Sequence, residues 1–130
     1  MSVLHVLAGY YAVCRLPSDA PIPEWAKGDF CAITRTPHEL SVACEQYLIP
    51  EGTRCERGWR ILQVEGPLEF STTGILSSIA GPLADAGVSI FAISTFDTDY
   101  VLVKEEVLEK AIQALGVAGH RVSQQPGAAG

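Results

Sequence analysis

The second half of the chain alternates between strand-like and helix-like patterns of apolar residues. In "WRILQVEGPL", Leu62 and Val64 alternate with polar neighbours, which predicts a strand that ends at Gly66 and Pro67. The next segment predicts a helix that ends at Gly87, because glycine readily adopts the left-handed conformation that closes many helices. The apolar residues of this helix recur at helical spacing, namely Ile75, Leu76, Ile79 and Leu83.

Two further strands and a second helix follow. "VSIFAIST" and "YVLV" predict strands joined by a short polar connection. "KEEVLEKAIQALG" predicts an amphipathic helix that Gly116 closes, and the segment ending at Val122 predicts a last edge strand. The resulting order of strand, helix, strand, strand, helix, strand is the ferredoxin-like α+β arrangement (βαββαβ), in which two helices cover one face of an antiparallel sheet.

The first half repeats part of this layout. "FCAITRTPHELSVACE" (30–45) and "IFAISTFDTDYVLVKE" (90–105) align without a gap at a distance of 60 positions, which places Glu39 on Asp99. The proline-rich "PSDAPIPEWAKGD" before it allows no more than a turn of helix, and a strand that extends to Pro50 leaves no room for a second one. The N-terminal unit is therefore predicted to be truncated and built mainly of β-strands.

This pattern divides the chain into a truncated unit at 1–57, a complete α+β unit at 58–123 and a disordered tail at 124–130. In "VSIFAIS", apolar residues occupy both faces of the predicted strand. The face that the helices leave uncovered is therefore expected to meet another surface. We expect a homodimer on this ground.

Composition narrows the class of partner. The 130 residues are 48% apolar and carry a net charge of −6. Because lysine and arginine form no run, neither nucleic acid nor an anionic membrane is an expected partner. The N-terminal "MSVLHVLAGYYAVCRL" lacks the basic region and cleavage site of a signal peptide, which favours the cytoplasm.

The four cysteines form no C-x-x-C pair and have no histidine at ligand spacing, which argues against a zinc site. Four cysteines could make two disulfides, but without a secretory signal we expect Cys14, Cys31 and Cys44 to be apolar packing residues. Cys55 lies between two arginines that would favour a thiolate, although no base for a reactive thiol is visible nearby.

Candidate ligand groups lie at a helix start and at a strand bend. A helix N-terminus offers amide groups without intrahelical partners and a partial positive charge, so the backbone near Gly74 and Ile75 can hold a carboxylate. The bend at 95–99 presents carbonyl groups and the carboxylates of Asp97 and Asp99, which suit an ammonium or guanidinium group. Structural explanations stay open for both features, because "STTG" caps a helix and aspartate favours bends.

Several stretches together resemble the ACT domain: "GPLEFSTTGIL", "AGVSIFAISTFDTDY" and "LVKEE", with "TRTPHELSVAC" extending the resemblance into the first half. The chain is similar to the small bacterial two-unit ACT proteins related to the CASTOR-type arginine sensors. This resemblance implies an ACT fold in the C-terminal half and a ligand site made by the helix start, the strand bend and a Ser-Val pair of the other unit. The residues carried over are Gly74, Ile75, Thr95, Phe96, Asp99, Ser41 and Val42.

ACT domains of this kind bind amino acids or other small ligands and report their occupancy to an assembly or an enzyme. The resemblance therefore implies a non-catalytic regulatory or sensor protein that binds an amino acid and acts on an unidentified target protein, with no cofactor and no metal. A ligand-free dimerisation or interaction module is the alternative. Catalysis is disfavoured because the sequence shows no nucleophile–base pair, no phosphate loop and no metal cluster.

Overall fold

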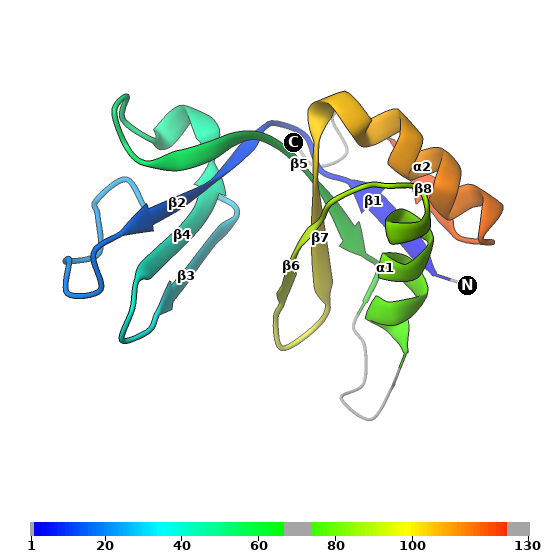
Figure 1. Ribbon diagram of the computed structural model, residues 1–130, viewed down its shortest axis with the longest axis horizontal. Coiled ribbons are helices and arrows are strands. Elements are labelled where there is room, and N and C mark those ends of the chain that lie inside the picture. Colours follow the sequence, from blue (N-terminus) through cyan, green and yellow to red (C-terminus); the bar gives the residue numbers. More distant parts are fainter. Residues whose placement is uncertain (1, 67–73, 125–130) are drawn as a thin grey trace. The chain divides into compact units, whose positions relative to one another are not determined.

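The computed structural model describes residues 2–66 and 74–124 (Figure 1). They form two compact units: unit 1 comprises the described residues of 1–8 and 60–130, and unit 2 comprises 9–59. The elements in chain order are β1 (Val3–Val6), β2 (Tyr11–Leu16), β3 (Cys31–Arg35), β4 (Leu40–Glu45), the 3-10 helix η1 (Gln46–Leu48), β5 (Cys55–Val64), α1 (Ile75–Asp85), β6 (Phe91–Ser94), β7 (Asp99–Lys104), the 3-10 helix η2 (Glu105–Val107), α2 (Leu108–Val117) and β8 (Arg121–Ser123).

Unit 1 has the predicted βαββαβ order with one strand added. Its strands lie in the order β6-β7-β5-β1-β8. The added strand, β1, is antiparallel to β5 and parallel to β8, so it stands between the first and last strands of the predicted unit. Both helices cover one face of the sheet, where they enclose a core of Leu4, Val6, Leu62, Val64, Ile79, Leu83, Val88, Val101, Val103, Leu108, Ala111 and Leu115.

Both helices of unit 1 end in the same hydrogen-bonded motif. After α1, Gly87 has a φ of 77° and its N–H donates to the Ala84 carbonyl, as the sequence predicts. The prediction that Gly116 closes the second helix is wrong: α2 continues to Val117, and the left-handed glycine is Gly119, with a φ of 96°. Among the described residues, no helix is long and apolar enough to cross a membrane.

Unit 2 is an antiparallel sheet with the order β3-β4-β2-β5. Its buried core consists of Ala12, Cys14, Leu40, Val42, Cys44 and Ile49. Residues 17–30 contain turns but no helix, as their proline content predicts. The strand expected to extend to Pro50 instead ends at Glu45, because the chain turns into η1.

The two hairpins β3–β4 and β6–β7 show the internal repeat with a register of 59 positions rather than 60. Ala32 pairs with Ala43 in unit 2, and Phe91 pairs with Leu102 in unit 1. The turns match in the same register, because 36–39 and 95–98 are closed by equivalent hydrogen bonds. Glu39 therefore corresponds to Thr98, and its predicted equivalence with Asp99 is wrong by one position.

Strand β5 belongs to both units. Its first part, 55–59, pairs with β2 in unit 2, and its last residues, 62–64, pair with β1 in unit 1. Residues 2–8, expected in the N-terminal unit, lie in unit 1 because β1 is part of its sheet. The tail expected at 124–130 lies, from residue 125 onward, outside the described residues.

Candidate ligand-binding site

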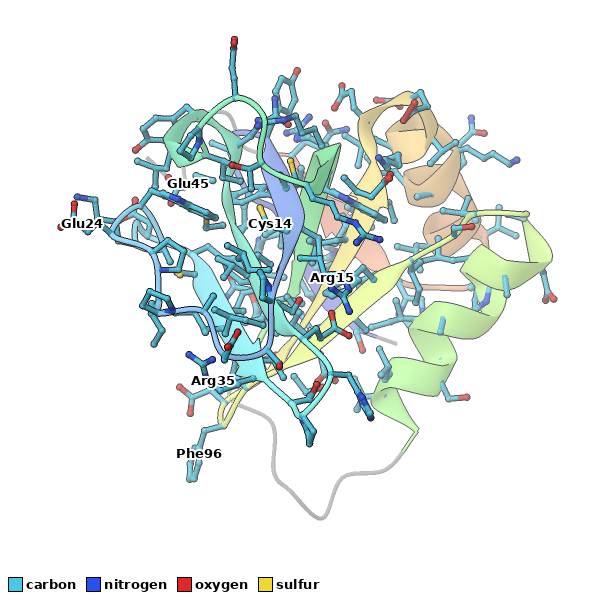
Figure 2. The ribbon with its side chains drawn as sticks, turned by 60° about the vertical axis from the view of Figure 1, so that its left-hand side comes forward. Cys14, Arg15, Glu24, Arg35, Glu45 and Phe96 are labelled. Carbon is cyan, nitrogen blue, oxygen red and sulfur yellow. The ribbon has the colours of Figure 1, made fainter. Side chains whose placement is uncertain are left out.

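The turn between β6 and β7 presents four of the predicted site residues. Thr95 closes the turn: its N–H donates to the Thr98 carbonyl at 2.8 Å, and its Oγ1 accepts the Thr98 N–H at 3.3 Å. At the tip, Asp97 is exposed and Phe96 is 79% exposed. Figure 2 shows the Phe96 ring pointing away from the hairpin. The turn thus presents an aromatic ring and a carboxylate to solvent.

Asp99 is the first residue of β7 and lies opposite Ser94 of β6. The Ser94 hydroxyl donates to Asp99 Oδ1 at 2.6 Å, which fixes the orientation of the half-buried carboxylate. Within the described part of the chain, the other carboxylate oxygen accepts no hydrogen bond. One oxygen is therefore held in place and the other is available to a donor on a ligand.

This turn is anchored to the end of β5 by two residues that the sequence does not single out. Thr98 is 5% exposed, and its Oγ1 donates to the Val64 carbonyl at 2.6 Å. Gly66 fits beneath the turn, since an added Cβ would lie 3.0 Å from Thr98 Cβ and 3.1 Å from the Asp97 carbonyl oxygen. In the sequence, Gly66 marks only the end of a strand, because the residues that it approaches lie far from it along the chain.

The start of α1 supplies the other predicted groups. Gly74 is the N-cap residue, with a φ of 79°, and as a glycine it has no side chain that could cap the first turn. The predicted caps Ser71, Thr72 and Thr73 lie outside the described residues. An added Cβ at Gly74 would meet no atom of residues 2–66 or 74–124 within 4 Å, so the described part of the chain does not cover the helix start there. Ile75 is partly buried and packs against the core under the helices.

Figures 1 and 2 both place the first turn of α1 and the β6–β7 turn at the same end of unit 1. The helix start carries backbone N–H groups and the positive end of the helix dipole. The hairpin turn carries carbonyls and two carboxylates. One end of unit 1 therefore has partly positive hydrogen-bond donors at the helix start and negative acceptors at the turn. A zwitterion has a carboxylate for the first and an ammonium group for the second.

The remaining predicted residues, Ser41 and Val42, lie on β4 in unit 2. Ser41 is half-buried and pairs with Thr34 and Arg15 on the neighbouring strands. Val42 is fully buried and its side chain belongs to the core of unit 2. Their side chains point to opposite faces of the sheet, because residues alternate along a strand. Any contact of Val42 with a ligand would thus involve its backbone.

Two different family profiles match the two parts of the chain. The family profile described as the ACT domain matches residues 54–116, and a profile for the N-terminal domain of a second family matches 9–52. A crystal structure of a protein from Agrobacterium tumefaciens is 41% identical, with a TM-score of 0.90, and the match covers 95% of this chain and 93% of that chain.

Two further matches are partial in length or low in sequence identity. The human cytosolic arginine sensor for mTORC1 subunit 1 is 45% identical over 58 residues, which are 44% of this chain but only 18% of the length of that protein. The regulatory subunit of aspartate kinase from Thermus thermophilus has a TM-score of 0.61 at 14% identity, covering 88% of this chain and 94% of that chain. This last likeness concerns the fold alone.

Proposed function

Because the chain belongs to the ACT-domain family, we propose that it is a regulatory protein that binds a free amino acid without converting it. The name of the matched human relative, an arginine sensor, supports an amino acid as the ligand class. Since this chain matches 18% of that sensor, the ligand, the target protein and the cytoplasmic location are proposed for this chain rather than transferred.

The observation that carries the proposal is the pairing of opposite charges at one end of unit 1. The α-carboxylate of the ligand accepts hydrogen bonds from the backbone at Gly74 and Ile75, where the N-cap residue is a glycine and has no side chain of its own to bind these amide groups. Its cationic group binds to the carbonyls of the turn and to the open oxygen of Asp99. Ser41 and Val42 stay predictions that rest on the family resemblance.

A thermal-shift screen of the twenty amino acids tests this function. Binding to the folded state raises the melting temperature, and a ligand at 100 times its Kd stabilises the protein by about 2.7 kcal/mol. We expect at least one amino acid to give a concentration-dependent rise. If none does, the ligand-free interaction module becomes the better description.

The variant Asp99→Asn tests the site within the same screen. It removes the charge but keeps the shape, so the rise in melting temperature should be lost. Asp19→Asn is the matched control, because Asp19 is an exposed turn residue in unit 2 and should leave the response unchanged. Equal responses of both variants would exclude the assigned role of Asp99 while leaving amino-acid binding itself in place.

We further propose that the chain forms a homodimer. β6 is the edge strand of unit 1, and its apolar residues Phe91 and Ile93 remain partly exposed. An edge strand presents a row of unpaired N–H and C=O groups with which a strand of another chain can pair. Light scattering coupled to size-exclusion chromatography should give twice the mass of one chain, and the mass of a single chain would contradict a dimer.

A further inference from the structure

Four cysteines lie on one face of unit 2 in two directly opposed pairs. Cys14 on β2 is opposite Cys55 on β5, and Cys31 on β3 is opposite Cys44 on β4. In each pair one thiol is buried in the core of the unit, and the other packs against this core from a partly buried position. All four are free thiols in the structure.

The backbone places Cys14 and Cys55 at a spacing suited to a disulfide. The Arg15 N–H donates to the Arg54 carbonyl at 3.0 Å, so these neighbours form a hydrogen-bonded pair of the antiparallel ladder. Such pairs alternate with non-hydrogen-bonded ones, and the cysteines occupy the next position. Opposed Cα atoms in that class are about 4.5 Å apart, within the range of roughly 4.4–6.8 Å that disulfides span.

The same argument applies to Cys31 and Cys44. The Thr36 N–H donates to the Glu39 carbonyl at 2.9 Å, which makes the residues that close this turn a hydrogen-bonded pair. The register runs without a shift along the whole hairpin. Counted along this ladder, alternation makes the two cysteines another non-hydrogen-bonded pair, in which the side chains approach most closely.

The two thiols of each pair differ in accessibility, while burial and the neighbouring Glu45 raise the pKa of the partly buried Cys31 as well. Burial raises the pKa of Cys14 to about 12 and the pKa of Cys44 to about 11, with neighbouring thiols adding to both effects. A buried thiol is a poor first target for an oxidant, because the thiolate is the reactive form. Figure 2 shows Cys14 on β2 inside the unit. The partly buried partners, Cys31 and Cys55, are the ones that a small oxidant can reach.

We propose that Cys14–Cys55 and Cys31–Cys44 are a reversible oxidative modification site whose oxidant is hydrogen peroxide. The more accessible thiol of each pair attacks peroxide, the O–O bond breaks, and a sulfenic acid and one water molecule form. The buried thiol then attacks the sulfenic sulfur, so that an S–S bond forms and a second water molecule leaves. Two thiols are oxidised by two electrons for each peroxide reduced, and a small thiol such as glutathione reverses the step.

A metal centre is the competing use of four thiols, and the geometry does not favour it. Over residues 2–66 and 74–124, no group of three or more His, Cys, Asp and Glu side chains is arranged to hold an ion. The sheet instead separates the cysteines into two opposed pairs. The strand register therefore favours the formation of one disulfide within each pair over a shared metal site.

Peptide mapping of the full chain tests the proposal. Trypsin cuts after Lys27 and after the arginines, so it leaves each cysteine on its own peptide: 1–15, 28–35, 36–54 and 55–57. The native protein is treated with peroxide, blocked with iodoacetamide and digested without reduction. We expect peptide 1–15 joined to 55–57 and peptide 28–35 joined to 36–54, and both links should disappear after dithiothreitol.

Two controls separate directed pairing from unspecific oxidation. Oxidation of the protein unfolded in urea should scatter the links over all pairings. Cys55→Ser should remove the first link and keep the second, and Cys31→Ser should do the reverse, since both positions are only partly buried and tolerate the change. Four alkylated cysteines, or a dominant link between Cys14 and Cys44 in the native protein, would overturn the proposal.

Discussion

The charge of Asp99 is useful to a ligand only because neighbouring residues hold it in one orientation. The Ser94 hydroxyl donates a hydrogen bond to one carboxylate oxygen of Asp99. The buried Thr98 hydroxyl donates to the Val64 carbonyl and so holds the turn that precedes Asp99. A hydrogen-bonded carboxylate that keeps one free oxygen loses little conformational freedom when a ligand binds. At the scale of single residues, the hydroxyls of the turn therefore determine how well its carboxylate can bind a cation.

Gly74 is expected to be required for its backbone conformation and not for space. An added Cβ has room, but the left-handed φ of 79° disfavours any other residue, so Gly74→Ala should lower the free energy of unfolding by about 1 kcal/mol. Gly81→Ala is the matched control: Gly81 lies within α1 with equally open surroundings and no positive φ. This second variant should raise stability by about 0.5–1 kcal/mol. Urea unfolding measures both, and changes of the same sign would contradict the argument.

At the scale of elements, strong periodicity was enough to predict the main parts of unit 1. Leu62, Val64, Ile79 and Leu83 are core residues in the structure, as their spacing predicts. β1 was not anticipated, because a four-residue strand has too few positions for alternation to stand out. Its position beside β5 depends on tertiary pairing, which no local pattern records.

For the candidate site, too, the sequence predicts local features but not the contacts between distant segments. The sequence predicts a bend with two acids and a helix that begins near Gly74, and both features are present. A gap-free alignment of 30–45 with 90–105 places Glu39 on Asp99, whereas the turn hydrogen bonds set the register one position away. The roles of Gly66 and Thr98 could not be predicted, since they arise only when the end of β5 and the hairpin turn meet.

His120 connects three separate segments of unit 1 and should contribute to its stability. Its Nδ1 accepts the Ser2 N–H at 3.0 Å, and its Nε2 lies 2.9 Å from the Ser78 carbonyl on α1. Since the histidine is 7% exposed, His120→Ala leaves both partners without their hydrogen bonds and should lower the free energy of unfolding by about 2 kcal/mol. His38→Ala, at an exposed turn position of unit 2, should change it by less than about 0.5 kcal/mol. Similar losses in both variants, measured by urea unfolding, would contradict this role.

At the scale of the whole molecule, the buried thiols predict sensitivity to alkali. Burial raises the pKa of Cys14 from its ordinary value of 9.0 to about 12, so the unfolded chain releases this proton before the folded chain does. The stability that the neutral Cys14 thiol contributes is therefore fully present below pH 9, and it is lost as the pH rises toward 12. Urea midpoints under reducing conditions, at about pH 8 and about pH 10, should show this loss. Cys14→Ala lowers stability at both values but should show a smaller difference between them, and an unchanged difference would rule the thiol out as a cause.

The single strand β5 has a practical consequence for dissecting the molecule. It runs through ten residues from Cys55 to Val64, and its two parts pair in different units. A gene cut at the unit boundary would sever this strand and leave each product with unpaired backbone, a known route to aggregation. Fragments meant to fold separately should both encode the complete strand, so that the two products overlap in sequence.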